Sequence, residues 1–176
     1  MQAVDLDADL IPGTSAAGWR IGVRLVECAE LLRGATEVEY RPGFRLVDAI
    51  NCNVGVLIVR NTFPLGSGHT AVYCGANLVD LGFNVREELF EVTVWEGYRG
   101  RAFGQIGIGS SVREVRSLFP LFYDGGDEMY YPDRELSPGA PSGIAFCASE
   151  VEEPGGTPIL GISIHDWDVM RRASGA

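Results

Sequence analysis

The chain has 176 residues, 46% of them hydrophobic and 22% charged, a composition that suits a packed core and not a disordered polymer. Its formal net charge is −10, which argues against nucleic acid and anionic membranes as main partners because an acidic surface repels phosphate. No apolar run reaches the ~18 residues that span a bilayer, and no signal-peptide pattern opens the sequence. We therefore expect a cytoplasmic globular protein.

Cysteine and histidine give no sign of a metal site or a cofactor. The chain has only two histidines, His69 and His165, so a site built from several histidines is excluded. Its four cysteines are scattered among apolar neighbours without metal-ligand spacing: Cys28, Cys52, Cys74 and Cys147. Buried free thiols in a reducing compartment are the simplest interpretation.

The first part of the chain predicts one helix and several strands. Residues 1–10 alternate partly and suit an edge strand or an acidic lead-in, and residues 21–32 resemble a helix. A change to period two then predicts three strands, at residues 38–40, 44–50 and 54–59.

The middle of the chain predicts a hairpin and a half-buried strand. Residues 70–73 and 78–81 flank a turn at 74–77, after a loop at 61–68. Residues 89–95 alternate, with Phe90, Val92 and Val94 on one face and Glu91 and Thr93 on the other. This alternation is typical of an antiparallel strand with one solvated face.

Residues 108–119 predict a helix with a defined start and end. Ser111 and Glu114 have the spacing of a capping box, and Pro120 cannot continue a helix. Apolar residues then recur with helical spacing at Val112, Val115, Leu118 and Phe119.

The helix at 108–119 matches residues 21–32 without a gap, sharing Ile, Gly, Glu and Leu at four positions. The strands that follow also correspond: 128–131 with 37–40, 143–147 with 55–59, and 160–164 with 90–94. This self-similarity predicts an α+β fold of two tandem helix-plus-antiparallel-meander repeats, with the sheet covered on one face by helices. The repeats would be residues 1–100, with an extra hairpin, and 101–176, together in one compact unit.

No catalytic constellation is evident. Cys74 with His69 and Asp80 is the only local nucleophile arrangement, and a buried structural cysteine explains Cys74 more simply. The glycines before residue 110 match neither a phosphate loop nor a dinucleotide fingerprint, and residues 124–128 miss the ligand spacing of a calcium loop. We therefore predict a protein that is not an enzyme and holds neither metal nor cofactor.

Residues 124–153 contain eight acids and one base, Arg134, and aromatic residues are interleaved with them. Aromatic anchors among acids suit contact with a basic protein. The partner-binding residues predicted from this segment are Tyr123, Asp124, Asp127, Glu128, Tyr130, Tyr131, Asp133 and Glu135. The alternative is an ordinary acidic loop whose tyrosines pack over their own sheet.

The doubled unit that opens with Ile-Gly-x-x-x-x-Glu resembles the tandem-repeat plan of the beta-lactamase inhibitor protein and of small envelope-lipoprotein domains. The second half, with its motifs at residues 107–112, 143–146 and 162–164, also looks like bacterial immunity proteins encoded beside contact-delivered toxins. That resemblance implies a cytoplasmic inhibitor of a cognate toxin with a basic surface. The chain lacks the inhibitor's signal peptide and disulfide pairs, so its target would differ.

Two other functions are compatible with the sequence. One is an enzyme or small-ligand binder that uses a cleft between the two halves, with His69, Cys74 and Asp80 as its site. The other is a structural protein that self-associates through its sheet. The oligomeric state is left open.

Overall fold

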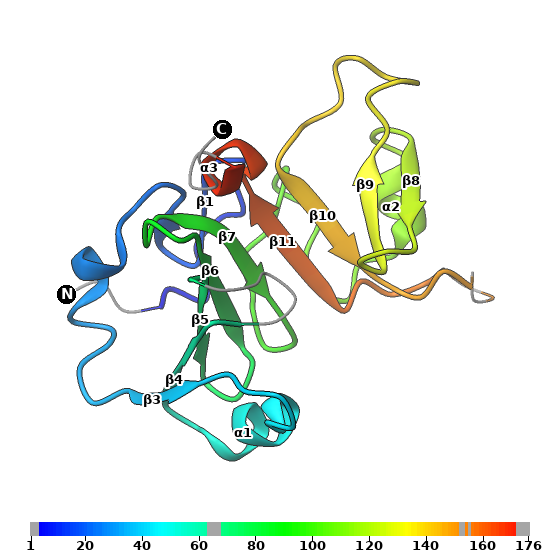
Figure 1. Ribbon diagram of the computed structural model, residues 1–176. Coiled ribbons are helices and arrows are strands. Elements are labelled where there is room, and N and C mark those ends of the chain that lie inside the picture. The colour runs from blue at the N-terminus through cyan, green and yellow to red at the C-terminus, as the bar shows by residue number, and fades with distance from the viewer. Residues whose placement is uncertain (1–3, 63–67, 152–153, 155, 172–176) are drawn as a thin grey trace.

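The computed structural model describes residues 4–62, 68–151, 154 and 156–171, which form an α+β fold dominated by β-sheet (Figure 1). The described strands make one nine-stranded sheet and a separate two-stranded sheet. The small sheet consists of β1 (Ser15–Ala16) and β2 (Trp19–Arg20). The helices are η1, a 3-10 turn (Leu25–Cys28), α1 (Leu46–Cys52), α2 (Val112–Arg116) and α3 (Trp167–Arg171).

The nine strands of the large sheet are, in chain order, β3 (Thr36–Glu39), β4 (Val56–Arg60), β5 (Thr70–Cys74), β6 (Val79–Phe83), β7 (Leu89–Val94), β8 (Leu121–Asp124), β9 (Met129–Pro132), β10 (Ile144–Cys147) and β11 (Gly161–His165). In space they follow the order β3-β4-β5-β6-β7-β11-β10-β9-β8. Two runs of neighbouring strands, one from each part of the chain, therefore meet where β7 pairs with β11. The sheet is bent, and Figure 1 shows the two runs at an angle to each other.

The strand pairs are antiparallel except for β3 and β4, which are parallel and connected through α1. A parallel pair requires a crossover because the chain must return to the same end of the sheet. The prediction of a strand at residues 44–50 is therefore wrong. Leu46, Ala49 and Ile50 have helical spacing and pack together against Leu57 and Val59 of β4.

The helix predicted at residues 21–32 is only the 3-10 turn η1. At its start the amide of Arg24 donates a 2.8 Å hydrogen bond to the carboxylate of Glu27. The second helix has the predicted capping box: the Ser111 amide donates to Glu114 Oε2 at 2.6 Å, and the Glu114 amide donates to Ser111 Oγ at 3.3 Å. The pattern did not predict β1, β2, β8 or α3. Within residues 4–10 only Leu10 forms a bridge, with Ala102.

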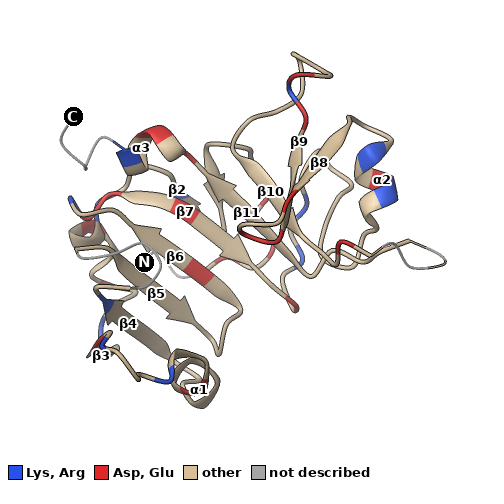
Figure 2. Ribbon diagram, turned by 45° about the vertical axis from the view of Figure 1, so that its right-hand side comes forward, with Lys and Arg blue, Asp and Glu red and all other residues tan. Residues whose placement is uncertain are grey.

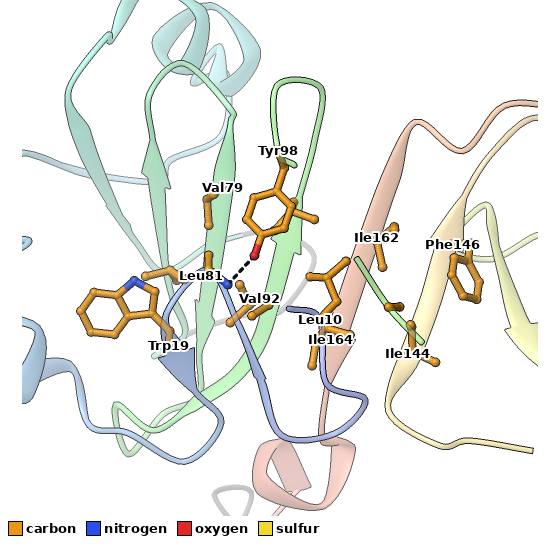
Figure 3. Packing of buried hydrophobic residues seen from close by; sticks show 14 of the residues in the cluster. Leu10, Trp19, Val79, Leu81, Val92, Tyr98, Ile144, Phe146, Ile162 and Ile164 are labelled. Atoms are coloured by element: carbon orange, nitrogen blue, oxygen red, sulfur yellow. Dashed lines mark hydrogen bonds between the residues drawn. The ribbon is translucent and has the colours of Figure 1, made fainter. Parts of the chain in front are cut away.

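One face of the large sheet carries the main hydrophobic core. Its longest row of directly paired side chains crosses eight strands, from β4 to β8: Val56, Cys74, Val79, Val94, Ile162, Phe146, Tyr130 and Tyr123. Segments outside the sheet cover this row, including buried Leu10 and Trp19 from the N-terminal region (Figure 3). Val112 and Val115 of α2 belong to the same core. Fully burying one such side chain contributes about 1.5–3 kcal/mol.

The N-terminal region is held over this core by a buried hydroxyl. Tyr98 Oη donates a 2.6 Å hydrogen bond to the Ala8 carbonyl and accepts a 3.0 Å hydrogen bond from the Ala17 amide (Figure 3). One side chain thus satisfies two backbone groups of the N-terminal region, one before β1 and one after it.

The opposite face carries α1 and α3. Ile50 of α1 forms a second apolar cluster with Leu57 and Val59, and α3 lies against β7. The helices are therefore divided between the two faces, since α2 packs on the core face, whereas the pattern predicted helices on one face. The alternation predicted for Phe90, Val92 and Val94 is interrupted by a bulge opposite Gly82 and Phe83. Because of this bulge, Leu89 joins Val92 and Val94 in the main core in place of Phe90.

Within the described part of the chain, no helix is long and apolar enough to span a membrane. All four cysteines are free; Cys28 and Cys74 are buried, and Cys52 is exposed.

Candidate functional site

Two rows of paired residues form the centre of the face opposite the main core. The first row crosses β5, β6, β7 and β11 and is polar: Tyr73, Asp80, Thr93 and Ser163. The adjacent row contains Ala71, Gly82, Glu91 and His165. Because a strand directs successive side chains to opposite faces, these residues project away from the apolar row. Ala71 and Gly82 of the second row have small side chains, so the sheet surface is hollow beside Asp80 and Glu91.

This hollow is a pocket of about 290 Å³, which we call the acidic pocket. It is lined by Thr62, Ala71, Tyr73, Asp80, Leu81, Gly82, Glu91, Thr93, Asp127, Met129, Tyr131 and Trp167. Three of these residues are acids: Asp80 from β6, Glu91 from β7 and Asp127 from the turn between β8 and β9. Figure 2 shows the acidic positions of β6 and β7 as red bands on the ribbon.

Asp80 is held in place by a neutral donor. Trp95 Nε1 donates a 2.7 Å hydrogen bond to Asp80 Oδ2. Burial raises the pKa of Asp80 to about 7, the indole hydrogen bond opposes this rise, and the charge of Glu91 adds to it. Asp80 is therefore a carboxylate near the midpoint of its titration at neutral pH.

Glu91 is held by the neighbouring strand. Ser163 Oγ donates a 2.7 Å hydrogen bond to Glu91 Oε1 and lies 3.3 Å from His165 Nδ1. Burial raises the pKa of Glu91, the hydrogen bond from Ser163 lowers it, and the charge of Asp127 raises it again. Burial also lowers the pKa of His165 to about 4, so this imidazole is neutral at pH 7 and supplies no counter-charge.

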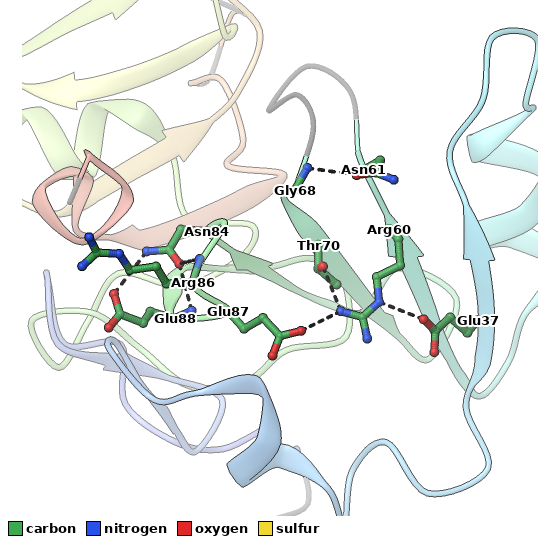
Figure 4. Close-up of polar contacts among 9 residues, drawn as sticks. All are labelled: Glu37, Arg60, Asn61, Gly68, Thr70, Asn84, Arg86, Glu87 and Glu88. Atoms are coloured by element: carbon green, nitrogen blue, oxygen red, sulfur yellow. Dashed lines mark hydrogen bonds and ion pairs between the residues drawn. The ribbon is translucent and has the colours of Figure 1, made fainter. Parts of the chain in front are cut away.

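No salt bridge among the described residues involves Asp80 or Glu91. Arg60 of β4 is engaged elsewhere: it contacts Glu37 at 2.8 Å and Glu87 at 3.1 Å (Figure 4). A buried carboxylate without a cation is costly, and strongly shifted carboxylates in a cleft mark candidate functional sites.

A continuous series of ring contacts crosses the same face, and we call it the aromatic ladder. Its successive ring centroids are 6.3, 5.9, 4.4, 5.8 and 5.6 Å apart. The rings belong, in order, to His69, Phe90, Trp167, His165, Tyr131 and Phe122. The ladder joins β5 to β8 and supplies two walls of the acidic pocket, Trp167 and Tyr131. Tyr131 also donates a hydrogen bond to Asp127 Oδ2, and burial, followed by this bond, raises the pKa of Tyr131.

Strand alternation divides the aromatic residues of the predicted partner-binding segment between two faces. Tyr131 stacks on Phe122 on the pocket face, whereas the Tyr130 and Tyr123 rings lie 4.9 Å apart on the core face. Tyr130 is only 2% exposed, and its hydroxyl donates to the Ser149 carbonyl at 3.1 Å. Of the three predicted tyrosines, Tyr131 alone lines the acidic pocket.

The predicted acids are also distributed over separate places. Asp127 lines the acidic pocket, while exposed Asp124 ends β8 and exposed Glu128 lies in the β8–β9 turn. Asp133 and Glu135 follow β9 and line a different hollow with Phe122 and Arg134. The eight predicted residues therefore do not form one continuous patch.

The alternative catalytic arrangement is not assembled. His69 and Asp80 lie on the pocket face, but Cys74 belongs to the buried row of the core face. Burial raises the pKa of the Cys74 thiol to about 12, which disfavours the reactive thiolate. Among the described residues, no group of three His, Cys, Asp or Glu side chains is placed to hold a metal ion.

The residues that sequence reasoning missed are Tyr73, Glu91, Thr93, Ser163 and Trp167. Glu91 and Thr93 were assigned to a solvated face, although that face is partly enclosed here. The sequence did contain a signal for this site. In these strands, acids and hydroxyl side chains alternate with strongly apolar residues, which is the pattern of a strand inside the sheet with one polar face.

No family model matches the chain, and no curated protein or solved structure matches it.

Proposed function

We propose that this is a non-enzymatic binding protein that receives a basic surface of a partner protein on its acidic pocket and aromatic ladder. The observation that carries the proposal is the pair Asp80 and Glu91. Both carboxylates are substantially buried, and neither forms a salt bridge with a described residue.

Energetics favour a basic partner. Burying an unpaired charge destabilises the free protein, and an incoming cation offsets that cost through a strong, charge-assisted interaction. The net charge of −10 would also accelerate encounter with a basic protein at low salt. Aromatic side chains beside the acids supply contact area, as anchors at protein interfaces commonly do.

We further propose that the partner is a bacterial toxin and that the protein acts as its immunity protein in the cytoplasm. Toxins that act on nucleic acid or nucleotides often have basic clefts, which an acidic inhibitor complements. The free cysteines are compatible with a reducing compartment. The tandem-repeat plan belongs to this proposal: a run of strands, antiparallel except for β3 and β4, lies on each side of the β7–β11 pair, and a turn or helix precedes each run.

Co-expression with the product of the adjacent gene tests the proposal. We expect that product to stop growth when expressed alone and to be neutralised, in a co-purifying complex, by the intact chain. Asp133→Asn should retain protection, since Asp133 lies outside the pocket. An adjacent product that is harmless alone, or that kills despite this protein, would overturn the proposal.

A small-ligand function is the second candidate. The acidic pocket combines side chains from β5–β7 with others from β9 and α3, so it lies where the two runs of strands face each other. A cationic metabolite that binds tightly, in the absence of any protein partner, would favour this function. Self-association through the outer strands β3 and β8 is a third, and a monomer by light scattering would remove it.

A further inference from the structure

We propose that the acidic pocket is an arginine-side-chain receptor: it takes one guanidinium group between Asp80 and Glu91. The source of that arginine, a loop of the partner protein, rests on the proposed function. The binding site itself is defined by this chain alone.

The placement of the two acids suits a broad, planar cation. Asp80 is paired with Thr93 and Glu91 with Gly82, so the acids are diagonal neighbours on adjacent strands of one face. Diagonal neighbours are on the order of 7–8 Å apart at the backbone, and their carboxylates can approach a guest from two sides. A guanidinium has five N–H donors in a fixed plane and can serve both carboxylates, whereas an ammonium is a compact point charge.

The other groups of the pocket complement a guanidinium. Tyr73 stands beside Asp80 in the polar row, and Tyr131 and Trp167 line the same cavity. Guanidinium planes stack on aromatic rings through dispersion and cation–π attraction. The described residues place no three ligating side chains around a point, which disfavours a metal ion as the guest.

An unused polar atom gives independent evidence for a guest. Thr62 lines the acidic pocket, is only 2% exposed, and its Oγ1 has no hydrogen-bond partner among the described residues. Buried hydroxyls are normally satisfied because an unmade hydrogen bond costs about 1–3 kcal/mol. A guanidinium N–H is a suitable donor to this oxygen. The volume of about 290 Å³ suits a single side chain and lies just below the usual range for drug-sized ligands.

Binding should be coupled to proton release. The ionisable groups that face the guest are Asp80 and Glu91 from β6 and β7, Asp127 and Tyr131 from the β8–β9 hairpin, and Tyr73 from β5. Burial raises the pKa values of both Asp80 and Glu91; that of Asp80 is about 7, so the Asp80 carboxyl is partly protonated near neutral pH. A cation between them favours the ionised forms, and affinity should therefore increase as pH rises from 5.5 to 8.5.

The test uses the whole chain and a probe that needs no partner protein. N-acetyl-arginine amide is titrated into isotope-labelled protein at pH 8, and amide shifts are followed by NMR. We expect saturable shifts on β6, β7 and β11, and none from N-acetyl-citrulline amide, which has nearly the same shape without the charge. The lysine analogue should bind more weakly.

Variants locate the site. Asp80→Asn and Glu91→Gln should each weaken binding of the arginine probe about tenfold or more, as loss of one charge-assisted hydrogen bond predicts. The matched control is Glu135→Gln, which removes an acid outside the pocket and should change affinity less than twofold, roughly the scatter of such surface changes. If either pocket variant fails to fold, the pH dependence of the wild-type protein decides.

The possible outcomes separate this inference from the proposed function. Equal binding of the citrulline probe, shifts that map elsewhere, or affinity that does not rise with pH overturns the arginine site. Toxin neutralisation that survives Asp80→Asn and Glu91→Gln overturns the placement of a partner arginine in this pocket, and with it the pocket as the docking site, while the immunity role itself stands. Specific binding of the arginine probe without any toxin neutralisation would support the arginine site and overturn the proposed function.

Discussion

Ser163 Oγ donates a 2.7 Å hydrogen bond to Glu91 Oε1, and this bond crosses the β7–β11 pair at which the two runs of strands meet. Glu91 has its raised pKa in spite of this bond, which stabilises the ionised carboxylate. The serine thus partly offsets the cost of keeping an acid at the centre of the sheet.

Replacing Ser163 by Ala should therefore destabilise the fold and increase the pKa of Glu91 further. The expected loss is about 1–3 kcal/mol at pH 8, the usual cost of leaving a buried polar group unsatisfied. Urea denaturation measures it, with exposed Ser142→Ala as the control. An unchanged free energy of unfolding for Ser163→Ala would contradict the importance of this bond.

Asp80→Asn should stabilise the protein at high pH. The folded pKa of Asp80, about 7, lies above the ordinary value of 3.8, so between these pH values the folded chain retains a proton that the unfolded chain has lost. The stability that this group contributes is full below pH 4 and is lost as pH rises through 7. Asparagine does not ionise and retains an oxygen for the Trp95 indole.

The difference between Asp80→Asn and wild type should therefore be small at pH 4 and reach about 2–4 kcal/mol at pH 8, in favour of the variant. Urea unfolding at a series of pH values provides the measurement. Equal stability at pH 8 would show that solvent reaches Asp80 freely. A stabilising change that also weakens the binding of an arginine probe would be the trade-off expected of a binding residue.

Tyr98→Phe should release the N-terminal region from the core. The lost hydroxyl serves both the Ala8 carbonyl and the Ala17 amide, and the latter residue is fully buried. The expected cost is about 1–3 kcal/mol. Hydrogen exchange should show faster exchange of the Ala17 amide in particular, whereas Tyr123→Phe, a change of the same kind on β8, should leave that amide protected.

Gly143→Ala should be among the most damaging single substitutions. A Cβ at residue 143 would lie 2.5 Å from Gly13 Cα and 2.6 Å from the His165 carbonyl oxygen, and the residue has φ of 76°. Gly104 has a similar φ of 70° with nothing near its hypothetical Cβ. Gly104→Ala should therefore show the conformational cost alone, about 1 kcal/mol, and Gly143→Ala a loss several times larger by thermal unfolding. Similar losses for the two variants would refute the close approach.

Period-two alternation predicted most central strands because their apolar residues form one uninterrupted core row. The capping box predicted the start of α2 for an equally local reason. The prediction of a strand at residues 44–50 was wrong because the spacing of Phe44, Leu46 and Ile50 suits a strand as well as a helix. Only the parallel pairing of β3 with β4, a nonlocal fact, selects the helix.

The candidate site was harder to predict than the fold. Asp80, Glu91 and Ser163 lie in three different strands, and alternation alone assigns all three to solvent. They become a pocket because Trp167 of α3 and the β8–β9 hairpin lie around them on the same face, an arrangement that depends on strand order and sheet curvature. Local patterns contain neither of these.

The strand order also has a consequence for how the polypeptide acquires its shape. β11 follows every other strand of the sheet in the chain, yet it sits between β7 and β10. During synthesis, β7 and β10 must wait on the ribosome with open hydrogen-bonding edges until residue 165 has emerged, and such edges are prone to aggregation. We expect insertion of this late strand to be the slow event in folding, and the carboxylates of β6 and β7 to stay fully hydrated until it occurs.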